Sequence, residues 1–301
     1  MARAEVHPGQ DRHVWTRNYD PPAPPLPSLF VIASKLESRQ ANKVLRRDLV
    51  IRSPHDIMDG IGTLQLLNNL LKHITQAYEQ PATWAPMPLR DETVNLSPAL
   101  RVAASIPPNL SSQQSQRLEN IIEQNANLRS NTELLTTPFK KDTAVTGKHQ
   151  RTVAKFSEPA TTECLRATKA LGAIITHVYH AAIVVFLRSL KSREPEPRKV
   201  RYVGYGLVHQ RSECQGEFST PKHAALVYHS VSSESLAIDV TGSSTQESWS
   251  ETRWQEEFES IAKRVKTYYS SIRYDIDAVA LAPSFWSMGT PHLAVPASRT
   301  I

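Results

Sequence analysis

The chain has 301 residues, of which 40% are hydrophobic and 21% are charged. This composition is typical of a soluble globular protein, and the length allows two lobes of ordinary size, so a wholly disordered chain is excluded. The 35 basic and 29 acidic residues give a net charge of +6, but the basic residues are scattered and no aromatic-interleaved basic stripe occurs. We therefore predict no nucleic-acid partner.

The two cysteines, Cys164 and Cys214, are too few for a disulfide framework, and their neighbours do not have the spacing of metal ligands. We predict buried thiols and no metal site. The opening residues lack the apolar core of a signal peptide, and the longest apolar run, Ala181 to Leu187, is too short to cross a bilayer. These features predict a protein without a membrane span in a reducing intracellular compartment, the cytoplasm.

The first 27 residues are polar and then proline-rich, as is typical of an extended polyproline II connector. The runs Leu29–Ala33 and Val44–Ile51 are β-branched or alternating, and each predicts a strand. After Gly60, apolar residues at steps of three and four predict a helix that ends near Glu79. The stripe expected to be buried consists of Leu64, Leu67, Leu71, Ile74 and Tyr78.

Between the second strand and this helix lies the sequence Ser-Pro-His-Asp-Ile-Met-Asp-Gly, residues 53–60, which has the form H-x-x-x-D-G. A histidine released from a strand just ahead of a helix can take a proton from an alcohol or amine, so His55 is the candidate general base. Gly60 is expected to permit close packing or a positive φ. The alternative is that Asp59 and Gly60 form an ordinary turn and that His55 is a surface histidine.

The segment that starts at Pro81 is rich in proline and contains one polar helix, predicted at 112–128. We predict an N-terminal lobe at 1–90, a linker or crossover at 91–148, and a C-terminal lobe at 149–301. A partly ordered surface excursion is the alternative reading of the linker.

The C-terminal lobe is predicted to begin with a strand at 152–156 and a helix capped by Thr161 or Thr162 that ends at Gly172. Thr176 is expected to cap a buried helix that extends to Leu187. Its two histidines, His177 and His180, are expected to be packed or solvent-tipped rather than metal ligands.

The remaining sequence predicts three strands and one helix. Val200–Val208 is the first strand, where Gly204 and Gly206 mark a bulge or a close backbone approach, and it leads to Arg211. The other expected elements are strands at 224–231 and 236–240, a long amphipathic helix from Trp254 to Tyr268, and loop after Leu281.

Three features in this order resemble the coenzyme A-dependent acyltransferase superfamily, which includes chloramphenicol acetyltransferase and peptide-synthetase condensation domains. They are the histidine motif in its strand-turn-helix setting, the Thr176–Leu187 helix, and the strand from Val203-Gly204 to Arg211. The passage Ala170–His177 and the triplet Tyr228–Ser230 resemble the fungal trichothecene O-acetyltransferases in particular. The D-F-G-W-G element of plant-type members is absent, and the chain looks shorter than the family at both ends.

The resemblance implies an α/β fold, a two-lobe chloramphenicol acetyltransferase-like (condensation-type) sandwich with an incomplete second lobe. It also implies that Arg211 pairs with Asp59, so that this buried pair and Gly60 support the loop that aims His55. The alternative is that Arg211 is a surface residue beside Glu213.

The function that the resemblance implies is transfer of an acyl group, most simply acetyl, from acyl-CoA to a hydroxyl of a secondary metabolite in mycotoxin-type biosynthesis. Acetyl-CoA then enters as a co-substrate, no cofactor is bound permanently, and no residue is assigned to coenzyme A binding. Two alternatives stay open. One is a condensation-type domain that forms an amide on a carrier-bound thioester, and the other is a non-catalytic fragment that keeps the lobe without the channel.

Overall fold

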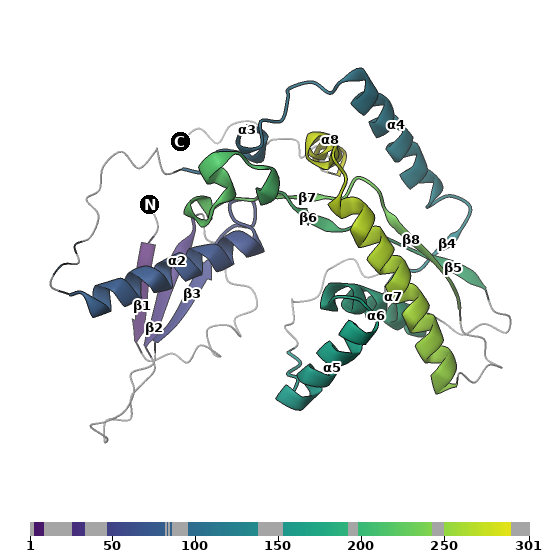
Figure 1. The fold of residues 1–301 in the computed structure, drawn as a ribbon, viewed down its shortest axis with the longest axis horizontal. Coiled ribbons are helices and arrows are strands. Elements are labelled where there is room, and N and C mark those ends of the chain that lie inside the picture. The colour runs from purple at the N-terminus through teal and green to yellow at the C-terminus, as the bar shows by residue number, and fades with distance from the viewer. Residues whose placement is uncertain are drawn as a thin grey trace, which may run out of the picture. The chain divides into compact units, whose positions relative to one another are not determined.

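The computed structural model describes residues 3–8, 26–33, 47–81, 83, 85, 96–137, 153–191, 198–242 and 250–289. The chain forms two compact units that interleave in sequence (Figure 1). The first unit consists of Met1–Ser105, Thr143–Ala154 and Arg211–His229, and the second unit of Ile106–Asp142, Lys155–Gln210 and Ser230–Ile301. The predicted division into contiguous segments at 1–90, 91–148 and 149–301 does not coincide with these units and stays a prediction.

The first unit contains a three-stranded sheet in the order β1-β2-β3, with β1 parallel and β3 antiparallel to β2. The strands are β1 (Arg3–Pro8), β2 (Ser28–Ala33) and β3 (Arg47–Arg52). The strands predicted around Leu29–Ala33 and Val44–Ile51 are therefore confirmed. The prediction of a connector from residue 1 missed β1. The sequence of β1 has few β-branched or aromatic residues, and the strand forms by pairing with the edge of β2. Most of the proline-rich stretch before β2 lies outside the described residues.

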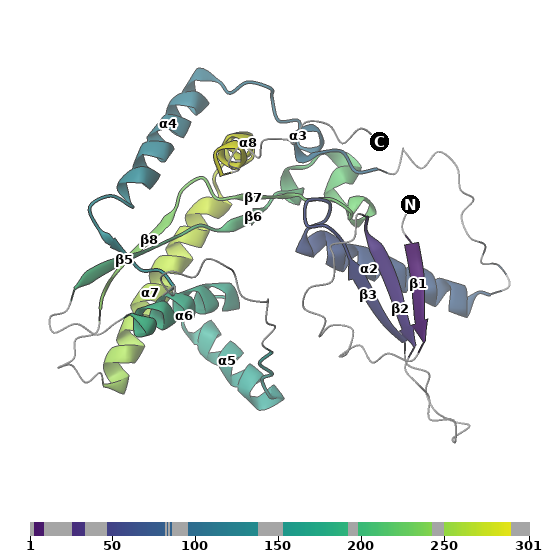
Figure 2. The same cartoon turned by 180° about the vertical axis from the view of Figure 1, so that it is seen from behind.

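Helix α2 (Gly60–Glu79) crosses one face of this sheet (Figure 1 and Figure 2). The helix is confirmed, but its predicted buried stripe is wrong, since Leu64, Leu71, Ile74 and Tyr78 are exposed and Leu67 is half-buried. The helix packs by another face, on which Gly62 is buried and Asn69 donates from Nδ2 to the Pro221 carbonyl at 2.9 Å. Positions two apart on a helix lie about 200° apart, so this face points away from the apolar stripe.

The rest of the first unit consists of α3 (Leu100–Ala103) and three short 3-10 helices, η2 (Arg211–Glu213), η3 (Gly216–Ser219) and η4 (Pro221–His223). A small core joins them through the buried side chains of Ala103, Cys214 and Tyr228. Cys214 is buried as predicted, whereas Cys164, on a helix of the second unit, is exposed. Cys164 lies on the solvent side of that helix, so the prediction of a buried thiol is wrong there.

The second unit contains a three-stranded sheet in the order β4-β5-β8, with β4 parallel and β8 antiparallel to β5. The strands are β4 (Glu133–Leu134), β5 (Lys199–Gly204) and β8 (Leu236–Thr241), and a separate ribbon pairs β6 (Leu207–His209) with β7 (His229–Val231). The chain breaks between β5 and β6 at Gly206, where an added Cβ would lie 2.7 Å from Ile272 Cδ1. The close approach predicted for this glycine is therefore present, and it divides the expected single strand in two.

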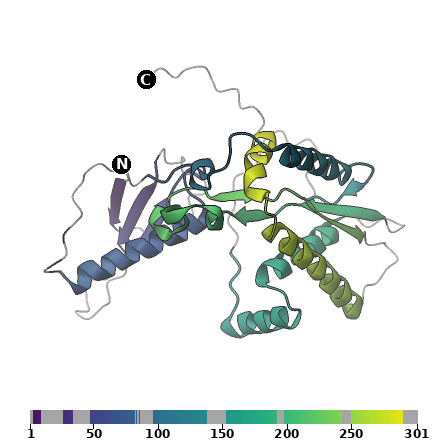
Figure 3. The ribbon, with the colours of Figure 1, turned by 45° about the horizontal axis from the view of Figure 1, so that its top comes forward.

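Five helices complete the described part of the second unit (Figure 3). They are α4 (Ser112–Asn127), α5 (Glu158–Ala170), α6 (Ile175–Leu190), α7 (Glu251–Arg273) and α8 (Ala278–Gly289). Helices α6 and α7 pack on each other and form the main core with β5 and β8, where Val184, Ile238 and Val265 are fully buried. The polar helix at 112–128 and the long helix through Trp254 are confirmed.

Five predictions in this unit were wrong in detail. Residues 153–157 form no strand, and the α5 cap is Ser157, whose hydroxyl accepts from Ala160 N. Helix α6 starts at Ile175, so Thr176 lies inside it, and its outer face is exposed rather than buried, with Phe186 at 60%. The residues after Leu281 that the structure describes, up to Gly289, are helical, because α8 continues through Pro283. Gly172 does end α5, with φ at +59°.

Within the described residues, no single helix is long and apolar enough to span a bilayer, and only the bent pair of α5 and α6, taken together, meets the length and composition criteria. The same residues contain no group of three or more histidine, cysteine, aspartate or glutamate side chains arranged to hold a metal ion.

Candidate active site

His55 lies on the loop that joins β3 to α2 in the first unit. The backbone turns at residues 55–57, and Ile57 N donates to the Pro54 carbonyl at 3.2 Å, which closes the turn. At this turn the His55 side chain is exposed. Its ring is therefore accessible to a molecule that approaches this unit.

Asp59 fixes the other end of the loop to the start of α2. Its Oδ1 accepts from Gly62 N at 2.6 Å, which makes Asp59 the N-cap of the helix. Its carbonyl oxygen accepts both from Thr63 N and from the Thr63 hydroxyl at 2.9 Å. The first turn of α2 therefore fixes the backbone conformation at the end of the His55 loop.

Arg211 binds the same carboxylate in a bidentate pair. Its Nη1 donates to Asp59 Oδ2 at 2.8 Å and its Nη2 donates to Oδ1 at 3.1 Å, and the two side chains are only 2% and 5% exposed. Nη2 also donates to the Leu226 carbonyl at 3.1 Å. The structure thus brings Arg211 and Asp59 together, 152 positions apart in sequence, and does not place Arg211 at the surface.

Tyr228 supplies a further donor to Asp59. Its backbone N donates to Oδ2 at 2.9 Å, and its ring lies 5.3 Å from the Arg211 guanidinium carbon. Burial opposes ionisation of Asp59, but hydrogen bonds from Arg211, Gly62 and Tyr228 outweigh it and hold the pKa of the carboxyl below its usual value. Burial raises the pKa of the Tyr228 phenol to about 12, so this group stays protonated.

The glycine that this cluster requires is Gly62 and not Gly60. A Cβ added at Gly62 would lie 2.2 Å from the Ala224 carbonyl oxygen and 2.8 Å from Arg211 Nη2. A Cβ added at Gly60 would meet no atom within 4 Å, and the φ of Gly60 is not positive. The support role predicted for Gly60 is therefore carried two residues later, where α2 meets the segment that follows Arg211.

His229 is a site residue that sequence reasoning missed. It opens β7, directly after Tyr228, and its ring centroid lies 6.1 Å from that of His55 in an edge-on arrangement. Its Nδ1 is 3.8 Å from Asp59 Oδ2. The triplet that contains it contributed only to the family resemblance, because nothing local in the sequence reveals that this strand begins beside the histidine loop.

No protein-family model matches the chain, and no curated protein matches it. Among solved structures, it is similar to the TRI3 trichothecene 15-O-acetyltransferase from Fusarium sporotrichioides, with a TM-score of 0.69, 17% identity, and coverage of 95% of this chain and 57% of that one. It is also similar to the first condensation domain of the CDA synthetase, with a TM-score of 0.50, 16% identity, and coverage of 90% and 53%. The same domain in complex with a substrate analogue gives a TM-score of 0.50, 17% identity, and coverage of 92% and 56%.

The chain thus spans little more than half the length of these proteins. At such identity the likeness shows the fold, which is the chloramphenicol acetyltransferase-like, condensation-type α/β fold. The fold class expected from the sequence and the resemblance to this superfamily are confirmed at that level.

Proposed function

We propose that this chain takes part in O-acyl transfer from acyl-CoA to a hydroxyl of a small secondary metabolite, with His55 as the general base. One observation carries the proposal: an exposed histidine sits on a loop whose far end is fixed by the buried pair of Asp59 and Arg211. A fold shared with an acetyltransferase and with condensation domains supports acyl transfer as the class of chemistry.

Asp59 itself is not available as a base. Its carboxylate accepts from Arg211 twice, from Gly62 N and from Tyr228 N. These four donors occupy the four acceptor positions that a carboxylate offers. Its role is to position the loop, and this leaves proton transfer to an imidazole.

In the proposed reaction His55 removes the proton of the acceptor hydroxyl as its oxygen attacks the thioester carbonyl of the acyl donor. The C–O bond forms, and the tetrahedral oxyanion collapses with loss of the C–S bond. The protonated His55 then donates this proton to the leaving thiolate. The electron count balances without a covalent enzyme intermediate, a metal or a redox step.

The first experiment measures coenzyme A release and product mass for purified protein supplied with acetyl-CoA and a trichothecene alcohol. His55→Ala is expected to lower turnover by about a hundredfold to ten-thousandfold, the range contributed by general-base catalysis. His73→Ala is the matched control, because His73 is an exposed histidine on α2. Equal turnover in the His55 variant and the wild type would refute the proposal.

The same assay separates the alternatives. An amide product from an amine acceptor and a carrier-bound thioester would favour condensation chemistry, which the likeness to condensation domains also permits. No transfer to any acceptor, together with no coenzyme A binding by calorimetry at millimolar ligand, would favour a non-catalytic role.

His229 is proposed as a positioning residue that acts through His55. His229→Phe keeps a ring against His55 and removes the nitrogen near Asp59. We expect kcat to fall by about tenfold with KM unchanged, because the ring nitrogen that faces Asp59 is lost while the substrate contacts stay. An unchanged kcat, or a fall in kcat accompanied by an equal rise in KM, would contradict this role.

A further inference from the structure

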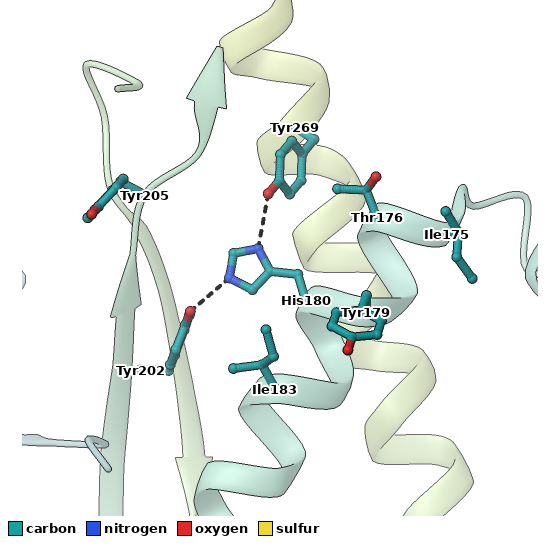
Figure 4. Close-up of a pocket in the computed structure, with 8 residues that line it drawn as sticks. All are labelled: Ile175, Thr176, Tyr179, His180, Ile183, Tyr202, Tyr205 and Tyr269. Atoms are coloured by element: carbon teal, nitrogen blue, oxygen red, sulfur yellow. Dashed lines mark hydrogen bonds between the residues drawn. The ribbon is translucent and has the colours of Figure 1, made fainter. Parts of the chain in front are cut away.

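A pocket of about 480 Å³ opens in the second unit, whereas His55 belongs to the first (Figure 4). Its walls come from the first three turns of α6, from β5 and the residue that follows it, and from α7. The lining residues are Ile175, Thr176, Tyr179, His180, Ile183, Tyr202, Tyr205 and Tyr269. The volume lies within the range of small-molecule sites.

His180 is the polar centre of this pocket and is only 8% exposed. Its Nε2 lies 2.9 Å from the Tyr202 hydroxyl and its Nδ1 lies 3.3 Å from the Tyr269 hydroxyl, so both ring nitrogens are bonded (Figure 4). Burial lowers the pKa of His180. The imidazole is therefore neutral at pH 7, with one nitrogen that donates and one that accepts.

This proton arrangement determines what the two tyrosines can offer. The hydroxyl that accepts from the imidazole N–H keeps its own hydrogen, whereas the other hydroxyl spends its hydrogen on the second ring nitrogen. Among the described residues, neither the Tyr202 hydroxyl nor the Tyr269 hydroxyl has another hydrogen-bond partner. The Tyr202–His180–Tyr269 cluster therefore presents one unused O–H donor at the buried side of the pocket, and the hydroxyls of Thr176, Tyr179 and Tyr205 also belong to the lining.

The rest of the lining restricts the ligand further. None of the eight side chains carries a charge at neutral pH, so nothing in the lining compensates a phosphate or a carboxylate. Tyr179 and Tyr205 are 67% and 61% exposed at the rim, where their faces are available for stacking. Ile175 and Ile183 add aliphatic surface.

We propose that this pocket binds a neutral, largely apolar ring compound that carries one acceptor oxygen, such as a ketone or an ester carbonyl. The ring skeleton packs against the rim tyrosines and isoleucines, and the oxygen accepts the free hydroxyl hydrogen of the Tyr202–His180–Tyr269 cluster. The site does not depend on acyl transfer by His55, which lies in the other unit.

The test uses two probes that differ only in the oxygen, 2-acetylnaphthalene and 2-ethylnaphthalene, titrated against the full chain by ligand-observed NMR. Both are expected to bind saturably at one site. The ketone is expected to bind roughly two- to tenfold more tightly, the contribution of one hydrogen bond. The proposal would be overturned if neither probe showed saturable binding.

Two variants locate the site. The double variant Tyr202→Phe/Tyr269→Phe keeps both rings and is expected to abolish the preference for the ketone. Tyr205→Ala removes a rim ring and is expected to weaken both probes by similar factors. The control is Tyr78→Ala, on α2 of the first unit, where the tyrosine is 86% exposed.

The outcomes are decisive in each case. Unchanged affinities in Tyr205→Ala, or a loss equal to that of the Tyr78 control, would overturn the location. A ketone preference that survives in the double variant would overturn the role of the hydroxyls. If the double variant fails to fold, as judged by its circular dichroism spectrum, Tyr205→Ala still tests the site.

Discussion

Two buried clusters, one in each unit, hold their polar side chains in opposite ways. In the first unit, Asp59 and Arg211 form a buried ion pair in which the carboxylate receives four donors. In the described part of the second unit, His180 is buried with two tyrosine hydroxyls and no charged partner within hydrogen-bond distance. The first arrangement favours the charged form of its carboxyl, and the second favours the neutral form of its imidazole. One cluster therefore resists acid and the other is sensitive to it.

The largest expected effect breaks the ion pair. Arg211→Ala leaves the Asp59 carboxylate buried without its charge partner, and such a loss costs about 3–5 kcal/mol in the free energy of unfolding. Urea unfolding followed by circular dichroism measures it. The control Arg166→Ala removes an exposed pair with Glu163 on α5, where no measurable loss is expected.

A double replacement sharpens the interpretation. In Asp59→Leu/Arg211→Met neither partner is left charged in the interior, so part of the lost stability is expected to return. An Arg211→Ala variant no less stable than Arg166→Ala would show that the pair contributes nothing to the first unit.

The next effect concerns the glycine beside this pair. Gly62→Ala puts a Cβ 2.2 Å from the Ala224 carbonyl, so the backbone must shift, and overpacking of this kind costs about 1–3 kcal/mol. Gly60→Ala is the matched control on the same turn, with open space around it and an expected change within about 0.5 kcal/mol. Thermal unfolding of the two variants compares them directly, and equal values would contradict the close contact.

The contrast between these glycines shows where sequence reasoning stopped. The motif and its strand-turn-helix setting followed from local patterns along the chain, and the pairing of Asp59 with Arg211 followed from the family resemblance. Gly62 did not, because its requirement comes from Ala224, a residue far away in sequence. His229 was missed for the same reason, since its place beside His55 depends on the path of a strand that no local pattern specifies.

The errors in burial have a similar origin. The apolar period of α2 correctly predicted a helix, but Leu71 and Tyr78 are exposed. The prediction failed because the period shows which residues share a face and does not show which face is covered. The same limit applies to α6, where the apolar residues Tyr179 and Phe186 face outward. Strand β1 was missed because its pairing depends on the edge of β2 more than on its own composition.

The smallest expected effect tests the opening contrast through pH. The folded-state pKa of His180 is lowered by burial, so below an unfolded pKa of about 6.5 the unfolded chain binds more protons and stability falls. His177, whose pKa is lowered by burial and by Lys266, adds to the same window. The pKa of the Asp59 carboxyl is lowered from 3.8 in the folded state. Its contribution to stability is therefore still complete near pH 6. It is lost only at lower pH, as the pH falls from 3.8 through the folded-state pKa.

Urea unfolding of the wild type between pH 7 and pH 3 should therefore show two separate declines. His180→Phe is expected to flatten part of the first decline, which begins near pH 6.5 and to which His177 still contributes, and to leave the second. Asp59→Asn is expected to do the reverse, although it starts from a lower stability. The variants are compared by the slope of unfolding free energy against pH and not by the free energy itself, because each substitution also removes contacts. Identical slopes near pH 6 in the wild type and His180→Phe would mean that the imidazole is protonated as readily in the folded chain as in the unfolded one, and the neutral cluster of the second unit would have to be abandoned.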